Sequence, residues 1–213
     1  MTDLADKLAG RFLVLDGPDG CGKSTQLTRL AAWLREQGAD VLETRDPGGT
    51  PVGDRIREVL LDAAHAEMTV ACETLLYMAS RAQLWDEVIA PALDTRRCVL
   101  CDRWVSATVA YQGAGGADAE DILAVYRTVL GDVGPDLTVV LDLDAETALA
   151  RTGAAVGRDR MERKNAGFHR TVRELFLRQA QYRPDRFAVV DAAGDADAVA
   201  CRIRETIIRW AEV

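Results

Sequence analysis

An apolar run that ends in a glycine-rich loop constrains the fold of this chain most. Residues 11–16 (RFLVLD) read as a short buried strand, and the loop Gly17–Ser24 (GPDGCGKS) follows at once. The loop fits the pattern GxxxxGK[ST] at every fixed position. Apolar residues then recur at helical spacing from Ser24 to Gln37, where Gly38 ends the helix. A strand, a glycine loop and a helix in this order predict an α/β unit.

The residue types of this loop suit phosphate binding. Glycines let the backbone curl so that N–H groups point inward at phosphate oxygens, and the helix N-terminus adds partial positive charge. Lys23 has the reach for the β- and γ-phosphates, and the Ser24 hydroxyl suits Mg²⁺. The alternative is an ordinary glycine-rich turn, but only 3 of the 26 basic residues are lysines, so a lysine here is rarely accidental. The candidate phosphate-binding residues are Gly17, Pro18, Asp19, Gly20, Cys21, Gly22, Lys23, Ser24 and Thr25.

Strand and helix patterns alternate along the rest of the chain. Further strands are expected at 41–44, 97–102, 137–142 and 187–191, and helices at 52–61, 70–93, 118–130, from 145, at 163–182 and at 196–211. Pro91 puts the end of the second of these helices in doubt. The alternation predicts an α/β fold with five parallel strands covered by helices on both faces. With no repeat or linker, residues 1–213 are expected to form a single domain.

Composition excludes several classes of protein. In 213 residues, 48% are hydrophobic and 28% are charged, which is globular rather than disordered or fibrous. The formal net charge of −8 disfavours a general nucleic-acid binder. No apolar run reaches the ~18 residues of a membrane span, and the N-terminus lacks a signal-peptide core, so a cytoplasmic protein without membrane contact is expected.

Five cysteines include one CxxC pair, Cys98 and Cys101. The pair lies within an expected strand, where side chains three positions apart point to opposite faces. Two such thiols cannot easily share a metal ion. We therefore interpret them as buried structural thiols.

Two further strands end in arginines. Asp102 and Arg103 follow one strand, and Arg45 ends another, in the segment TRDPGGT at 44–50. Ligands of open α/β sheets bind outside the carboxyl ends of the strands. Asp102 is therefore a candidate to hold Mg²⁺ or to orient an arginine, and the guanidinium groups are candidates for phosphate. A surface ion pair and a solvated loop arginine are the alternatives.

Two other segments allow both a structural and a functional interpretation. Tyr77, Arg81 and Trp85 share one helix face, either as a surface cation–π ladder or with the tyrosine stacked on a flat ligand and the arginine at its edge. The segment 157–164 (GRDRMERK) is either a lid that closes over phosphates or a solvated basic helix start.

Taken together, these segments resemble the thymidylate kinase family of P-loop nucleoside-monophosphate kinases. The segments GPDGCGKST, TRDPGGT at 44–50 and DRWVSATVAYQ at 102–112 look like its signatures, and LLYMASRAQ at 75–83 and RDRMERK at 158–164 agree. The resemblance covers nearly the whole chain. It implies a three-layer P-loop kinase fold with an arginine-rich lid at about 153–165. It also implies phosphorylation of dTMP to dTDP by ATP with Mg²⁺, in dTTP biosynthesis, by a homodimer.

The resemblance also implies roles for individual residues. Tyr77 would stack on thymine and Arg81 would bond its O4. Arg45 and Arg103 would hold the acceptor phosphate, and Arg158 or Arg160 would neutralise the moving phosphoryl group. The implied catalytic residues are Lys23, Arg103, Arg158 and Arg160; the dTMP-binding residues are Asp19, Arg45, Tyr77, Arg81, Arg103, Thr108, Tyr111 and Gln112; the metal residues are Ser24 and Asp102.

The chain departs from the family pattern at four positions. Asp46 replaces the usual glutamate, and Trp104 replaces the usual tyrosine or histidine. Ala107 stands where serine is usual, and Tyr77 stands where phenylalanine is common. These departures affect base selectivity more than phosphoryl transfer.

Three alternatives stay open: a deoxynucleoside kinase, a nucleoside-monophosphate kinase with another acceptor, and a nucleotide-binding switch without turnover. Residues 151–186 hold ten Arg and Lys against four Asp and Glu, a balance of +6, so basic charge is concentrated in and after the expected lid.

Overall fold

The computed structural model describes residues 4–152, 160–161 and 164–212. Within these residues, five parallel strands form one sheet in the order β2-β3-β1-β4-β5. The strands are β1 (Phe12–Asp16), β2 (Val41–Arg45), β3 (Cys98–Asp102), β4 (Leu137–Asp142) and β5 (Phe187–Asp191). The number of strands, their direction and their approximate bounds confirm the sequence prediction. Because all strands run the same way, the loops after β1, β2 and β3 meet at one edge of the sheet.

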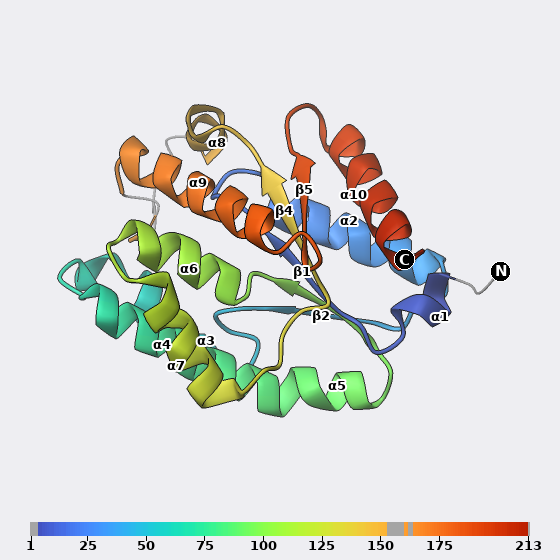
Figure 1. Ribbon diagram of the computed structural model, residues 1–213, viewed down its shortest axis with the longest axis horizontal. Coiled ribbons are helices and arrows are strands. Elements are labelled where there is room, and N and C mark those ends of the chain that lie inside the picture. Colours follow the sequence, from blue (N-terminus) through green and yellow to red (C-terminus); the bar gives the residue numbers. More distant parts are fainter. Residues whose placement is uncertain (1–3, 153–159, 162–163, 213) are drawn as a thin grey trace.

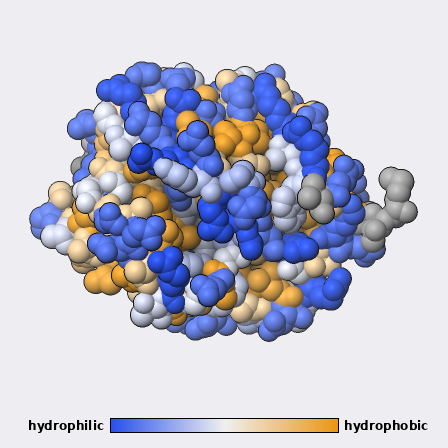
Figure 2. All heavy atoms as spheres, in the orientation of Figure 1, coloured by the Kyte–Doolittle hydropathy of each residue, from blue (hydrophilic) through white to orange (hydrophobic). Residues whose placement is uncertain are grey.

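Helices cover both faces of the sheet (Figure 1). Strand β1 alternates: Leu13 and Leu15 join the core that α2 and α10 cover, whereas Phe12 and Val14 join the core beneath α4 to α7. The helices are α1 (Leu4–Leu8), α2 (Lys23–Glu36), α3 (Pro51–Leu61), α4 (Val70–Leu84), α5 (Ala90–Asp94), α6 (Val105–Ala114), α7 (Ala119–Leu130), α8 (Ala145–Thr152), α9 (Ala166–Tyr182) and α10 (Ala196–Ala211). A 3₁₀ turn spans Ala63–His65. Outside these cores, the face seen in Figure 2 is mostly hydrophilic, with smaller hydrophobic areas between the polar side chains.

The two cysteines of the CxxC pair lie on opposite faces of β3, as predicted. Cys98 belongs to the core under α2 and α10, and Cys101 belongs to the core under α4 to α7. Both are free and buried. Burial raises the pKa of the Cys98 thiol to about 12, which keeps it protonated and unreactive at neutral pH.

Two of the expected helices have different bounds in the structure. The helix expected over 70–93 is interrupted by a π-helical turn at Trp85–Ile89, directly before Pro91 in the first turn of α5. Proline has no N–H for the ladder, and the widened turn accommodates that loss. The helix expected from 163 begins at Ala166, because the Asn165 side chain caps it by accepting the Phe168 N–H at 2.9 Å.

Helix α6 was not predicted as a helix at all. Every residue from Ser106 to Gln112 is buried, so the segment lacks the alternation of polar and apolar faces that marks a surface helix. It lies between α7 and α9 and follows the end of β3 (Figure 1). Its Ser106 and Tyr111 side chains contact Asp16 and Asp19, directly before and within the glycine-rich loop Gly17–Ser24 (the P-loop).

Among the described residues, no helix combines the length and the apolar character that crossing a membrane requires.

Candidate functional site

The glycine loop leaves β1 and leads directly into α2. At Gly17, φ is 133°, and an added Cβ would lie 2.5 Å from the carbonyl oxygen of Leu141, so only glycine fits. Gly22 occupies the N-cap of α2 in the left-handed conformation, with φ at 95°. The loop therefore presents backbone N–H groups and the positive end of α2 to the same space.

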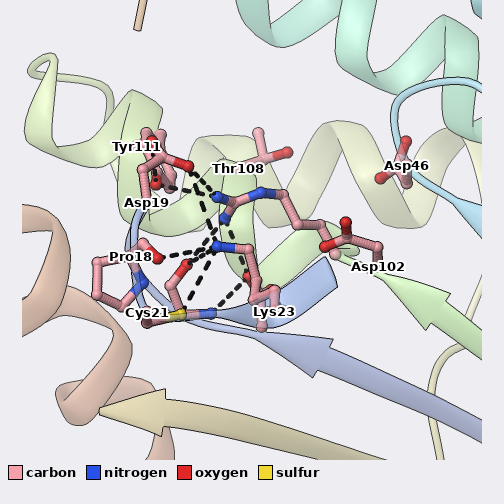
Figure 3. A network of polar contacts seen from close by, with 12 residues as sticks. Pro18, Asp19, Cys21, Lys23, Asp46, Asp102, Thr108 and Tyr111 are labelled. Carbon is pink, nitrogen blue, oxygen red and sulfur yellow. Dashed lines mark hydrogen bonds and ion pairs between the residues drawn. The ribbon is translucent and has the colours of Figure 1, made fainter. Parts of the chain in front are cut away.

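Lys23 folds back over this loop. Its side chain is 8% exposed, and Nζ donates hydrogen bonds to the carbonyl oxygens of Gly17 at 3.0 Å and Pro18 at 2.9 Å (Figure 3). The same Nζ lies 4.0 Å from Oδ1 of Asp19. The ammonium group is thus held inside the loop, where phosphates would bind.

A buried carboxylate is hydrogen-bonded to the first residue of the loop. Asp16, the last residue of β1, is fully buried and accepts hydrogen bonds from the Gly17 N–H at 2.9 Å and the Ser106 hydroxyl at 2.7 Å. Burial raises the pKa of Asp16, although the nearby charge of Arg103 opposes the shift. Its two oxygens are committed to the loop, to α6 and to Arg103.

Arg103 joins the P-loop to α6. The residue adopts a left-handed conformation with φ at 71°. Its Nη1 donates to the Gly17 carbonyl at 3.0 Å, and its Nη2 donates to Asp19 at 2.5 Å and to the Tyr111 hydroxyl at 3.1 Å. Burial favours neutral Asp19, but the charges of Arg103 and Lys23 outweigh it and lower the Asp19 pKa. Asp19 therefore stays ionised beside two cations (Figure 3).

A pocket opens beside this network. It holds about 540 Å³ of empty space, counting its open mouth, and extends from Asp19 and Arg103 to Arg81. Most of its wall comes from α4, α6 and the loop after β2. The lining residues are Asp19, Asp46, Pro47, Arg57, Leu61, Tyr77, Arg81, Arg103, Trp104, Ala107, Thr108, Tyr111, Gln112 and Met161.

Arg81 is fixed at one wall of the pocket. Its side chain is 1% exposed, with Nε 2.7 Å from Asp46 and Nη2 2.9 Å from Thr108. The guanidinium carbon lies 5.3 Å from the ring centre of Trp104. A surface ladder with Trp85 is thereby ruled out, since Trp85 packs into the core against Phe12 and Trp104. Tyr77, one helical turn before Arg81, lines the same pocket.

Two departures from the family pattern are explained by these contacts. Asp46 is buried and forms the ion pair that orients Arg81. Trp104 is fully buried, and its indole N–H donates to the Tyr126 hydroxyl at 2.9 Å. Both residues lie behind Arg81, so both shape the wall that Arg81 belongs to.

Arg57 is a pocket residue that sequence reasoning missed. Arg45, the predicted one, is 53% exposed and pairs with Asp54 at 3.0 Å, and it does not line the pocket. Arg57, on α3, does line it and donates to the Pro47 carbonyl at 3.0 Å. Burial, together with the charge of Arg45, lowers the pKa of Arg57. Its signal was weak, because DRIRE at 54–58 reads as a solvated helix face.

The predicted lid arginines have different positions. Arg158 lies outside the described residues. Arg160 is 5% exposed, forms an ion pair with Glu73 and donates from Nε and Nη2 to the Leu60 carbonyl at 3.1 Å. Arg160 thus contacts α3 and α4, and no hydrogen bond or ion pair joins it to a described residue of the P-loop.

The predicted metal residues fit a magnesium ion bound together with phosphates. Asp102 lies beside the network in Figure 3, and its Oδ1 is buried with no hydrogen-bond partner among the described residues. Ser24 lies exposed in the first turn of α2. The described residues contain no cluster of three or more His, Cys, Asp or Glu side chains that could hold a metal by themselves. Mg²⁺ commonly takes one or two protein ligands and completes its shell with phosphate and water.

The parallel sheet, the P-loop after its central strand and the pocket beside that loop define a P-loop phosphotransferase. A family model for thymidylate kinase matches residues 15–203. Curated relatives called thymidylate kinase include one from Pseudomonas entomophila, 47% identical over 90% of this chain and 92% of its own. Another, from Deinococcus radiodurans, is 46% identical over 96% of both chains. The chain belongs to the thymidylate kinase family.

Proposed function

We propose that the protein transfers the γ-phosphoryl group of ATP to dTMP and releases dTDP and ADP. The observation that carries this proposal is the pocket that begins at Asp19 of the P-loop and Arg103 after β3 and is walled by the buried Arg81. A nucleoside monophosphate placed along it has its phosphate at the P-loop and its base beside Arg81. Family membership supports thymine as that base.

The base wall offers an aromatic ring and hydrogen-bond donors. In the proposed complex Tyr77 stacks on thymine, and Arg81 donates to its O4. Thr108 and Gln112 lie one turn apart on α6 and line the same space. Tyr111 faces the sugar, and its hydroxyl donates to Asp19 at 2.7 Å. Asp46 and Thr108 hold Arg81, so little ordering is needed when the base binds.

The phosphate end gathers positive charge. Arg103 and Arg57 line the pocket there, and Lys23 lies within the P-loop. In the proposed reaction an anionic oxygen of the dTMP phosphate attacks the γ-phosphorus, and the bond to the β,γ-bridging oxygen of ATP breaks. The acceptor oxygen carries no proton to remove, so no general base is required. The protein contributes positioning and charge neutralisation.

Ser24 and Asp102 would hold the magnesium ion of the ATP complex. Bound there, Mg²⁺ supplies positive charge to the β- and γ-phosphates. Arg158 remains the predicted lid arginine for the transferring group. The contacts of Arg160 favour a different role.

Replacing Lys23 with alanine tests the proposed chemistry. The ammonium group stabilises charge that develops on the transferring phosphoryl, and single stabilisers of this kind are often worth ~10²–10³ in kcat. We expect K23A to lose at least 10²-fold in kcat with ATP saturating, measured as ADP release with dTMP. A loss of tenfold or less in kcat at saturating ATP would contradict the role of Lys23 in stabilising the transferring phosphoryl group.

A deoxynucleoside kinase is the nearest alternative, and it would need a free carboxylate base for a sugar hydroxyl. The two carboxylates beside the P-loop are already bound: Asp16 to Gly17 and Ser106, and Asp19 to Arg103 and Tyr111. This arrangement favours a phosphate acceptor over thymidine.

The proposal includes a homodimer in the cytoplasm. Large aliphatic side chains are exposed on the packed pair α3 and α4, namely Val52 at 52%, Val59 at 42% and Leu75 at 59%. Such a surface suits contact with a second copy. Sedimentation equilibrium should give twice the chain mass of 23.2 kDa, and a monomer mass at micromolar concentration would contradict a dimer.

A further inference from the structure

A buried ionic cluster lies directly behind the pocket wall that α6 forms. Glu73 of α4 accepts hydrogen bonds on both carboxylate oxygens: Arg160 donates to Oε1, and the Gln112 side-chain amide donates from Nε2 to Oε2 at 2.9 Å. All three residues are at least 95% buried. Of the three, only Gln112 lines the pocket.

Glu73 determines which way the Gln112 amide points. An ionised carboxylate only accepts hydrogen bonds, so it must face the NH₂ group and not the carbonyl oxygen. The opposite end of the amide, Oε1, is buried and has no hydrogen-bond partner among the described residues. With its NH₂ directed to Glu73 behind the wall, Gln112 keeps an unpaired acceptor for whatever occupies the pocket.

Arg160 occupies the other carboxylate oxygen of Glu73. The guanidinium pairs with Glu73 and is itself fixed by two hydrogen bonds of 3.1 Å to the Leu60 carbonyl. With one oxygen taken by Arg160, Glu73 faces the Gln112 amide with the other oxygen, which accepts from Nε2. The amide orientation therefore depends on the Glu73–Arg160 ion pair.

We propose that Glu73 is a positioning residue that selects the acceptor base through Gln112; the inference rests on the proposed function for the nucleotide itself. The wall then presents a donor, Arg81, and an acceptor, the Gln112 carbonyl. A base edge with a carbonyl beside a ring N–H, as in thymine and uracil, complements this pair. Cytosine presents an amino group beside a bare ring nitrogen, which is the reverse pattern and leaves buried groups unpaired.

The test compares dTMP with dCMP in the variant Glu73→Gln. A glutamine at 73 donates as well as accepts, so the Gln112 amide is free to reverse. We expect the ratio of kcat/KM for dTMP to that for dCMP to fall at least tenfold, with KM for ATP unchanged. Because both substrates are assayed on one preparation, the ratio does not depend on the fraction of protein that is folded.

A surface pair of the same chemistry provides the control. Gln83 donates to Glu87 at 2.8 Å, and both lie away from the pocket lining. The variant Glu87→Gln should leave the ratio unchanged. In Gln112→Met the ratio should fall as in E73Q, and the double variant should lose no more than Q112M does.

Two results would overturn the inference: an unchanged dTMP/dCMP ratio in E73Q, or additive losses in the double variant. Should E73Q not fold, Arg160→Met serves instead, because it leaves Glu73 in place without its cation; an unchanged ratio there would equally refute the role. A wild-type protein that does not prefer dTMP over dCMP would contradict the proposed function. A wild-type preference for dTMP that E73Q leaves unchanged would contradict only the role of Glu73.

Discussion

At the P-loop, two cationic side chains donate hydrogen bonds to the same backbone carbonyl oxygen. Lys23 and Arg103 both donate to the Gly17 carbonyl at 3.0 Å, from the loop and from the end of β3 respectively. Like charges this close are tolerated because Asp16 and Asp19 lie between and beside them. In the proposed reaction, this positive charge is already in place where the two phosphates meet, which would reduce the reorganisation needed for transfer.

Replacing Asp19 with asparagine tests this balance of charges. Because the folded pKa of Asp19 lies below its ordinary value, the ionised carboxylate stabilises the fold above a pH of about 4. That contribution is lost as pH falls through the lower, folded pKa. We expect D19N to be less stable by roughly 1.5–3 kcal/mol at pH 7, the usual range for a hydrogen bond to a charged group, with the difference shrinking below pH 4.

Urea unfolding of both proteins between pH 7 and pH 3 measures this difference. A difference that stays constant or grows as the pH falls would contradict the assigned ionisation of Asp19.

Among the elements, α6 organises the site, although its sequence shows no helical periodicity. Its successive side chains bind different partners: Ser106 holds Asp16, Thr108 holds Arg81, Tyr111 holds Asp19, and Gln112 holds Glu73. A helix buried on all sides can make contacts in every direction, and for the same reason it lacks a polar face that would reveal it. Thr108, Tyr111 and Gln112 were predicted as site residues only through the family resemblance.

The strands and the P-loop, in contrast, could be predicted from local pattern. Buried parallel strands are continuous apolar runs, and the loop motif has fixed spacing. What local pattern cannot show is which of two arginines turns inward. Arg45 ends a strand at the ligand edge but pairs with Asp54 outside the pocket, whereas Arg57 belongs to a charged stretch yet lies within it. The difference depends on how α3 packs against the loop after β2.

At the scale of the whole molecule, the acidic total charge contrasts with a local group of cations at the candidate site. The chain carries −8 in total, yet Lys23, Arg57, Arg81 and Arg103 converge on one sheet edge. The acidic remainder disfavours long polyanions such as nucleic acid, while a few enclosed cations suffice for an anion of nucleotide size. A nucleotide-binding switch without turnover would be expected to lack Lys23 or the lid arginines, and this chain has both. The sheet order, which brings β3 beside β1, is what joins the P-loop to the acceptor pocket.

If the pocket accepts thymidine monophosphate beside the P-loop, acceptor choice will show it. ADP release with ATP and Mg²⁺ should be measured across dTMP, dUMP, dCMP, AMP and thymidine. We expect the highest kcat/KM for dTMP, with dTDP as product and little turnover of thymidine. A higher kcat/KM for any other acceptor, or ATP and dTMP binding without ADP release, would contradict the proposed function.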